Sequence, residues 1–215
     1  MNGTRSSHQA LEKLSQDRLD LLVLGGGIVG SGVARDAAMR GLRVGLIDRN
    51  DFAFGTSSRS SRLLHGGIRY LAQGRVGLVH EASVEKTILH RIAPHLAAPL
   101  AFVFPSYRGR GWPFWQLRVG VKIYDWLCRG RNLGPSATLE LPELFERVPG
   151  LKTTNLTGAV RYYDGFTQDA RLVLDTLRSA AAHGATLANY VRFKSAERRG
   201  DEFLVQAMDE LSGES

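Results

Sequence analysis

The feature that most constrains this chain is a glycine-rich turn between a short apolar run and a helix-forming stretch. Gly25, Gly27 and Gly30 have the spacing G-x-G-x-x-G, and the apolar run "LDLLVL" precedes them at residues 19–24. This run predicts a buried parallel strand. The stretch "IVGSGVARDAAMRG" that follows predicts a helix that ends at Gly41. A strand, a glycine turn and a helix in this order are the context in which the motif binds a dinucleotide.

A second apolar run completes the unit. The stretch "LRVGLIDRN" predicts a strand that ends at Asp48, so residues 19–48 form a βαβ unit with a right-handed crossover. The N-terminus of the helix offers free N–H groups and a partial positive charge to a pyrophosphate. The Asp48 carboxylate can accept hydrogen bonds from a ribose 2′-hydroxyl, which disfavours NADP. The motif alone does not separate NAD from FAD.

A hydroxyl-rich loop follows the second strand, where an NAD-binding chain would continue directly with further strands and helices. Its hydroxyl groups can bind the pyrophosphate and ribityl chain of a flavin, and its Gly66–Gly67 pair lets backbone approach a flat ring. The loop therefore favours a flavin cofactor. Its hydroxyl residues are Thr56, Ser57, Ser58, Ser60 and Ser61.

Four stretches of the chain resemble the FAD-dependent glycerol-3-phosphate dehydrogenases. They are "GGGIVGSGVARDAAMRG" (25–41), "TSSRSSRLLHGGIRYL" (56–71), "APHLAAPLAFVFP" (93–105) and "DARLVLDTLRSAAAHGA" (169–185). The second stretch is the specific one, because related amine and amino-acid oxidases share the glycines but usually lack it. The resemblance implies an α/β fold: a Rossmann-type FAD-binding domain of the glutathione-reductase/D-amino-acid-oxidase type, with part of an α+β substrate domain.

The resemblance also implies a role for each matching residue. Around the substrate, Arg69 would bind the phosphate, Tyr70 would lie beside it, and His65 is a candidate catalytic base whose alternative is a neutral structural role. No histidine has a metal-like pairing with carboxylates, so we expect no metal. For FAD, the resemblance places the ADP half on Gly25, Gly26, Gly27, Gly30 and Asp48, the phosphate and ribityl region on Thr56, Ser57, Ser58 and Ser61, the isoalloxazine along His65, Gly66 and Gly67, and the adenine at the backbone of Val191.

Members of this family oxidise sn-glycerol 3-phosphate to dihydroxyacetone phosphate and pass the electrons to quinone. Their remaining phosphate-binding cations, the strand that completes the FAD site and the cap domain would lie beyond residue 215. The resemblance therefore predicts a truncated N-terminal portion that is inactive alone. We expect a flexible leader (1–18), an FAD-binding unit (19–92), an insertion from the substrate domain (93–165) and a return to the FAD domain (166–215). The alternatives are a related amine or amino-acid oxidase, and a non-catalytic membrane-binding fragment.

The net charge of +7 is concentrated in one aromatic stretch, residues 108–131. A helix predicted there has a cationic strip that includes Arg118 and Lys122, flanked by Trp115 and Trp126. This pattern favours an anionic membrane surface. An ordinary helix packed on the domain is the alternative, and nucleic acid is disfavoured because no known binding module is present. We therefore expect a cytoplasmic protein held peripherally on the inner face of the membrane, with a homodimer as one oligomeric state.

Two further helices are predicted from periodicity. In "GLVHEASVEKTILHRIAPHL" the apolar residues Leu78, Ala82, Leu89 and Ile92 recur at helical spacing. The stretch "QDARLVLDTLRSAAAHGA" also predicts a helix, with Gly184 just past its end. The single cysteine, Cys128, rules out an intramolecular disulfide and fits a cytosolic setting.

Overall fold

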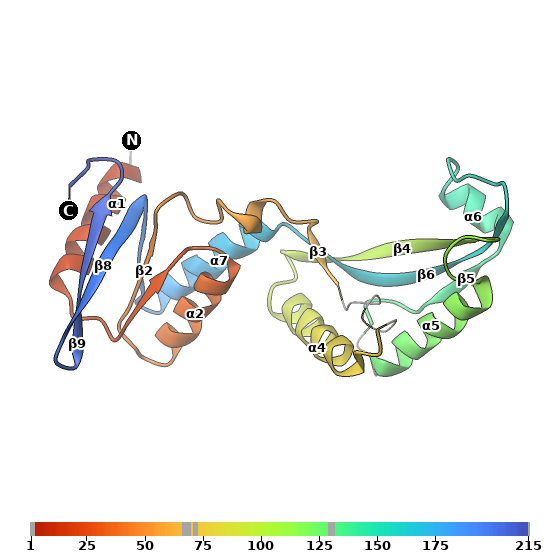
Figure 1. The fold of residues 1–215 in the computed structure, drawn as a ribbon, viewed down its shortest axis with the longest axis horizontal. Coiled ribbons are helices and arrows are strands. Elements are labelled where there is room, and N and C mark those ends of the chain that lie inside the picture. The colour runs from red at the N-terminus through yellow and green to blue at the C-terminus, as the bar shows by residue number, and fades with distance from the viewer. Residues whose placement is uncertain (1–2, 66–69, 71–72, 129–131, 215) are drawn as a thin grey trace. The chain divides into compact units, whose positions relative to one another are not determined.

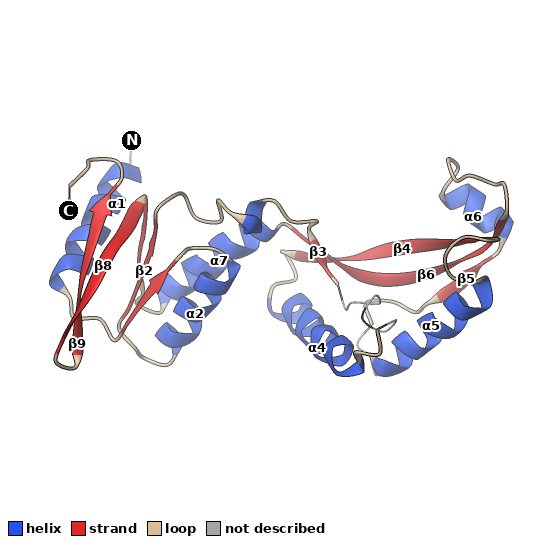
Figure 2. Cartoon of the chain, in the orientation of Figure 1, coloured by secondary structure: helices blue, strands red, loops and turns tan. Residues whose placement is uncertain are grey.

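The computed structural model describes residues 3–65, 70, 73–128 and 132–214. The chain divides into two compact units, whose elements are labelled in Figure 1 and coloured by type in Figure 2. Unit 1 comprises residues 1–61 and 168–215, and unit 2 comprises residues 62–167. Along the chain, unit 2 is therefore an insertion into unit 1.

In the described part of unit 1, a parallel sheet has the strand order β1-β2-β7. Strands β1 (Leu21–Leu24) and β2 (Val44–Asp48) are joined by helix α2 (Ile28–Met39), which confirms the predicted βαβ unit. An antiparallel hairpin of β8 and β9 follows this sheet. The other elements of the unit are α1 (Gly3–Gln16), η1 (Thr56–Ser58), α7 (Asp169–Ala182), β7 (Thr186–Asn189), β8 (Val191–Arg199) and β9 (Glu202–Asp209).

The two faces of this sheet are covered by different elements, because successive strand residues point to opposite faces. Val44 and Leu46 of β2 pack with α2 and α7, and the small side chain of Ala34 lets α2 approach closely. Ile47 points to the other face and packs with Leu14 of α1 and with the start of β8. Asp48, at the end of β2, thus stands on a strand that is fixed from both sides.

The N-terminal residues differ from the sequence-based expectation. Residues 1–18 were expected to be a flexible leader, whereas residues 3–16 form helix α1. The reason is a narrow apolar stripe of Ala10, Leu11 and Leu14 within a polar stretch, which packs on the cluster around Ile47. Three apolar residues at helical spacing are enough to dock a short helix on an open sheet face.

In the described part of unit 2, an antiparallel sheet has the order β3-β6-β4, with β5 also paired to β6. Strands β4 (Ala97–Tyr107) and β6 (Leu156–Thr167) pair along nearly their whole length. The other elements are β3 (Leu63–Leu64), α4 (Val76–Ile92), α5 (Phe114–Leu127), β5 (Ala137–Leu139) and α6 (Leu141–Arg147).

Helices α4 and α5 lie on one face of this sheet (Figure 1). Val79 of α4 and Tyr124 of α5 pack with Tyr162 of β6. On the other face, Leu144 of α6 packs with Ala159 of the same strand. Strand β6 therefore packs against helices on both faces of the sheet.

The boundary between the units differs from the predicted one. The sequence placed residues 76–92 in the FAD-binding unit and began the insertion at residue 93, whereas α4 belongs to unit 2, which begins at Arg62. The physical reason is Val79, which is fully buried among residues of α5 and β6. The two ends of unit 2 meet, because the Thr167 N–H donates to the Arg62 carbonyl at 2.9 Å.

Candidate functional site

The turn between β1 and α2 needs glycine for two reasons. Gly25 has φ of +106°, a conformation that residues with a side chain rarely adopt. At Gly30, a Cβ atom would lie 1.9 Å from the carbonyl oxygen of Gly25. The Gly25 N–H donates to the Ile47 carbonyl at 2.8 Å, which ties the turn to β2. The helix can therefore start directly above the end of the strand only with these glycines.

The Asp48 carboxylate is fixed by the same turn. Its Oδ2 accepts the Gly26 N–H at 2.7 Å, and its Oδ1 accepts the Asn50 N–H at 2.8 Å. Each carboxylate oxygen can accept more than one hydrogen bond, so both keep capacity for a further donor such as a hydroxyl. The carboxylate is thus held in one orientation before any ligand arrives.

The start of α2 presents backbone donors. The first α-helical hydrogen bond runs from Ser31 N to Gly27 O at 2.9 Å, so the amides of residues 28–30 precede the intrahelical ladder. The hydroxyl of Ser57 accepts the Ile28 N–H at 3.1 Å. A Cβ atom at Gly27 would meet only this hydroxyl, at 3.4 Å. The helix start therefore has space for a bound anion and a hydroxyl group beside it.

The other predicted hydroxyl residues of the loop have varied surroundings. Thr56 and Ser61 are exposed. Ser58 donates to the Phe54 and Gly55 carbonyls at 3.0 and 3.1 Å, which closes the short helix η1. Among the predicted phosphate and ribityl contacts, Ser57 is thus the residue that is hydrogen-bonded to α2.

Val191 begins β8 and is fully buried beside Ile47. The preceding residue, Tyr190, donates its N–H to the Asn50 carbonyl at 3.2 Å. Asn50 also contacts Asp48, so the start of β8 lies close to the end of β2. This neighbourhood is compatible with the predicted contact of the Val191 backbone with adenine, which stays a prediction.

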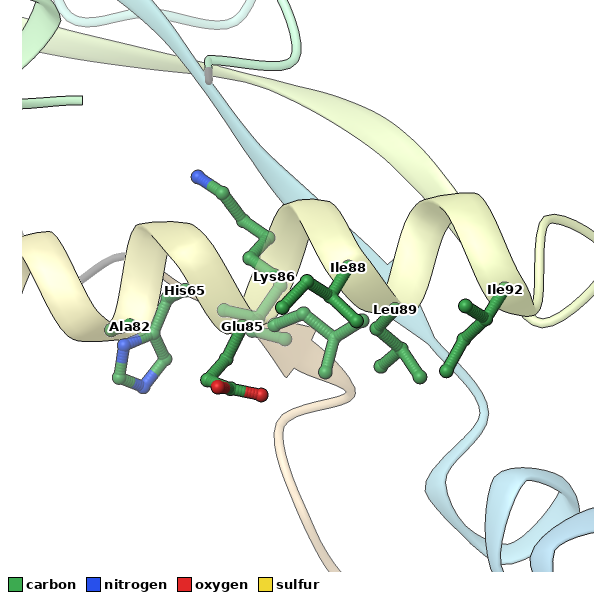
Figure 3. A pocket seen from close by; sticks show the side chains of 9 residues that line it. His65, Ala82, Glu85, Lys86, Ile88, Leu89 and Ile92 are labelled. Carbon is green, nitrogen blue, oxygen red and sulfur yellow. The ribbon is translucent and has the colours of Figure 1, made fainter. Parts of the chain in front are cut away.

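The predicted substrate residues belong to unit 2. Gly66, Gly67 and Arg69 lie outside the described residues. His65 is exposed and lines a pocket of about 410 Å³ together with Ala82, Glu85 and Ile92, and Figure 3 shows these side chains on one side of α4. Tyr70 is half-buried and packs on the cluster that contains Tyr124. The side chain of His65 is thus accessible in a pocket, whereas that of Tyr70 is partly covered by a hydrophobic cluster.

A buried polar network in unit 2 was missed by sequence reasoning. The Lys86 Nζ donates to Asp164 Oδ1 at 2.7 Å and to the Tyr124 hydroxyl at 3.3 Å. The Tyr124 hydroxyl donates to the same carboxylate oxygen at 3.2 Å. The side chains of Lys86 and Asp164 are only 2% and 3% exposed. Their partners come from α4, α5 and β6, so no local pattern could have predicted them.

The groups around this network stay protonated. Burial raises the pKa of the Tyr124 phenol, and the negative charge of Asp164 adds to the effect. Burial also raises the pKa of the Cys128 thiol, which lies 3.2 Å from the Ser83 hydroxyl. The Tyr124 hydroxyl can therefore act as a hydrogen-bond donor to Asp164 at neutral pH.

Helix α5 presents an apolar stripe outward. Trp115, Val119, Ile123 and Trp126 are spaced at about one turn from one another and are exposed, with the two tryptophans at 64% and 74%. Arg118 and Lys122 are exposed beside them, while Leu117, Val121 and Tyr124 are buried. In the described part of the chain, no helix is long and apolar enough to cross a bilayer, and no group of three acidic, histidine or cysteine side chains could hold a metal ion.

Comparison with known proteins assigns the family. A family model described as FAD dependent oxidoreductase matches residues 20–214. The chain belongs to this family. The chain is 40% identical over 213 residues to a glycerol-3-phosphate dehydrogenase of Mycobacterium leprae, an alignment that covers 98% of this chain and 36% of the relative. It is 42% identical over 203 residues to the mitochondrial glycerol-3-phosphate dehydrogenase of Macaca fascicularis, covering 90% and 27%.

These relatives confirm the resemblance stated from the sequence. The chain spans about a third of the length of the curated relatives it matches. Among solved structures, the glycerol-3-phosphate dehydrogenase from Bacillus halodurans complexed with FAD is 30% identical, with a TM-score of 0.72, covering 97% of this chain and 34% of that one. A glycine oxidase from Bacillus cereus, at 20% identity, TM-score 0.58 and coverage of 88% and 51%, shares the fold. The predicted fold class is thereby confirmed.

The residues of unit 1 fit the cofactor that gives this family its name. The open backbone at Gly27 and the N-terminus of α2 suit a pyrophosphate. The oriented Asp48 carboxylate suits a ribose hydroxyl. Pyrophosphate and ribose are both parts of the ADP half of FAD.

Proposed function

We propose that this chain supplies the ADP-binding site and part of the substrate unit of a flavoprotein that oxidises sn-glycerol 3-phosphate to dihydroxyacetone phosphate. The observation that carries this proposal is the β1–α2 turn, with Asp48 fixed by the Gly26 N–H, in a chain 40% identical to glycerol-3-phosphate dehydrogenases. The identity supports the substrate, and the geometry of the turn supports the cofactor.

The proposed roles of the residues follow from their chemistry. Bound FAD would supply the acceptor for the hydride that leaves C2 of the substrate. Asp48 would accept hydrogen bonds from the ribose, and the start of α2 would offset the charge of the pyrophosphate. His65 would take the proton of the C2 hydroxyl, and Arg69 would hold the phosphate by paired hydrogen bonds.

A titration of the enzyme that contains this chain with FAD tests the cofactor site. Replacing Asp48 with Ala removes a charge-assisted acceptor worth about 1.5–3 kcal/mol, so the FAD affinity should fall about 10- to 100-fold. Asp201→Ala, in the exposed turn of the β8–β9 hairpin, is the matched control and should bind as the parent does. Equal affinities of Asp48→Ala and the parent would contradict the proposed cofactor site.

Bleaching of bound flavin under anaerobic conditions tests the substrate. Glycerol 3-phosphate should bleach the flavin of the enzyme that contains this chain, whereas glycine should not. Bleaching by glycine alone would favour the amine or amino-acid oxidase alternative. Arg69→Ala should raise the glycerol 3-phosphate concentration needed for half-bleaching, because the substrate phosphate would lose one of its cations.

We also propose that the protein is peripheral on an anionic membrane surface at the cytoplasmic side, through residues 108–131, and passes its electrons to quinone. The exposed stripe of Trp115, Val119, Ile123 and Trp126 on α5, with Arg118 and Lys122 beside it, supports this attachment. A site near the membrane would bring the electrons within reach of a lipid-soluble acceptor. The homodimer stays a prediction.

Sedimentation with liposomes tests the attachment. The chain should bind vesicles that contain anionic lipid, and Trp115→Ala together with Arg118→Glu should weaken that binding at least 10-fold, because both apolar and electrostatic contacts are lost. Phe203→Ala, at an exposed residue of β9, is the control and should bind normally. Unchanged binding of the α5 variant would contradict the proposal.

A further inference from the structure

The buried network of Lys86, Asp164 and Tyr124 has no role in the proposed hydride transfer. A buried ion pair is also a weak source of stability, because desolvation of the charges offsets most of their attraction. An apolar trio would hold α4 and α5 on the sheet at least as well. Stability alone therefore does not explain why these charged side chains are buried in unit 2.

The first relevant contact joins the network to the strand before His65. Asp164 is followed in β6 by Gly165, which pairs with Leu64, the last residue of β3. The two chains approach so closely here that a Cβ at Gly165 would lie 2.9 Å from the Leu64 Cβ and 2.7 Å from the His90 ring. Strand β3, which ends one residue before His65, is thus paired with Gly165, the residue next to Asp164.

The second contact is made by α4. The His90 Nδ1 lies 2.8 Å from the Lys86 carbonyl oxygen, so the ring that presses on Gly165 is oriented by the backbone of the same lysine. Lys86 also lines the pocket that contains His65, and Figure 3 shows its ammonium group leaving α4 on the side away from His65. The lysine thereby links the sheet side of the helix to the pocket side.

The third contact concerns Tyr70. Its side chain packs on the hydrophobic cluster of which Tyr124, the aromatic member of the network, is a fully buried part. His65 and Tyr70, the two described residues predicted near the substrate, are therefore both supported by elements that meet at Lys86, Asp164 and Tyr124.

We infer that the Lys86–Asp164–Tyr124 network is a positioning device that sets the places of His65 and Tyr70. The charges act through β3, through the His90–Gly165 contact and through the Tyr124 ring, and they do not touch the substrate. That this position matters for catalysis rests on the proposed function. The placement itself can be measured without flavin or substrate.

The test is NMR of the histidine and tyrosine rings in the whole chain. The variant Lys86→Met with Asp164→Asn removes both charges of this pair while keeping the side-chain shapes. We expect a folded protein in which the His65 and Tyr70 signals each broaden or split into several. The His183 signal, from unit 1, should stay sharp. The exposed pair Glu143–Arg147 of α6 provides the matched control as Glu143→Gln with Arg147→Met, which should leave all signals unchanged.

The outcomes are distinct. A single sharp His65 signal, shifted or not, in the folded double variant would mean that the network alters the local field without setting position, and would overturn the inference. If the double variant does not fold, Asp164→Asn alone, which removes the carboxylate charge and keeps the side-chain shape, decides by the same His65 signal: splitting supports the inference and one sharp signal overturns it. Failure of glycerol 3-phosphate to bleach the flavin of the enzyme that contains this chain would refute the proposed function and would leave the NMR result unaffected.

Discussion

The glycine turn of unit 1 and the polar network of unit 2 are organised in opposite ways. In the turn, the conformation of residues 25–30 and the hydrogen bond to Asp48 involve mainly the backbone, and the spacing of the glycines along the chain already predicts them. In the network, Lys86, Tyr124 and Asp164 are far apart in sequence and meet only after two helices have packed on β6. The comparison teaches that a glycine turn can be determined by nearby residues, whereas a buried polar network depends on the folding of the whole unit.

The largest expected loss of stability comes from a substitution that breaks the network. Lys86→Met removes the ammonium group 2.7 Å from the buried Asp164 carboxylate, which should lower the free energy of unfolding by about 3–5 kcal/mol. Tryptophan fluorescence during urea unfolding reports this loss selectively, since all three tryptophans lie in unit 2. Lys152→Met, at an exposed position, is the control. A loss below 1 kcal/mol for Lys86→Met would show that the pair is not a buried one in solution.

The next effect breaks the glycine turn. Gly30→Ala forces a Cβ against the Gly25 carbonyl and should cost about 1–3 kcal/mol, together with FAD affinity. Gly32→Ala, in the same helix with nothing within 4 Å of its Cβ, should instead stabilise the protein by about 0.5–1 kcal/mol. Thermal unfolding followed by circular dichroism compares the two. Equal effects of the two substitutions would contradict the close approach at Gly30.

A smaller effect sharpens the comparison at the helix start. Ser57→Ala removes the acceptor of the Ile28 N–H and should cost about 0.5–1 kcal/mol, as loss of a helix cap does. Hydrogen exchange at the Ile28 amide should accelerate. Ser58→Ala, whose hydroxyl bonds within η1, should leave that amide unchanged. The same rate at Ile28 in both variants would rule out the Ser57 contact.

The smallest effect concerns the entry to β1. Hydrogen bonds from the Arg43 side chain and backbone lower the pKa of Asp20 to about 2. Because the folded pKa lies below the unfolded value, this contact stabilises the fold above about pH 4 and is lost as the pH falls toward 2. Asp20→Asn should therefore be less stable than the parent at neutral pH, and the difference should vanish near pH 2. Urea unfolding at several pH values measures it, and a difference independent of pH would contradict the assignment.

Helices α7 and α4 differ in how well the periodicity of their sequences predicts which side chains are buried. In α7, Val173, Leu177 and Ala180 have the spacing i, i+4 and i+7 and are buried, as expected for one face of a helix. In α4, Leu78 and Ile92 are exposed at helical spacing, while Ser83 and Lys86 are buried against the sheet.

The reason for the difference is the partner of each helix. Periodicity identifies the apolar face of a helix but not the surface on which that helix will pack. For α4 that surface includes Asp164 of β6, which requires a cation on the facing side of the helix. The βαβ unit, the glycine turn and Asp48 were predictable because each depends on neighbours within about thirty residues. The α4 orientation and the network were not, because both depend on a strand about eighty residues away.

The hydrogen bond between Thr167 and Arg62 bears on how the chain assembles. Strand β7 must pair with β2 although residues 62–167 separate them, and closing an unstructured loop of about a hundred residues would cost about 4 kcal/mol of chain entropy. Once unit 2 is folded, its two ends emerge side by side, and most of that entropy has already been lost. The parallel sheet of unit 1 can then close as if its two segments were joined by a short link, so an early-folding unit 2 would accelerate the completion of unit 1.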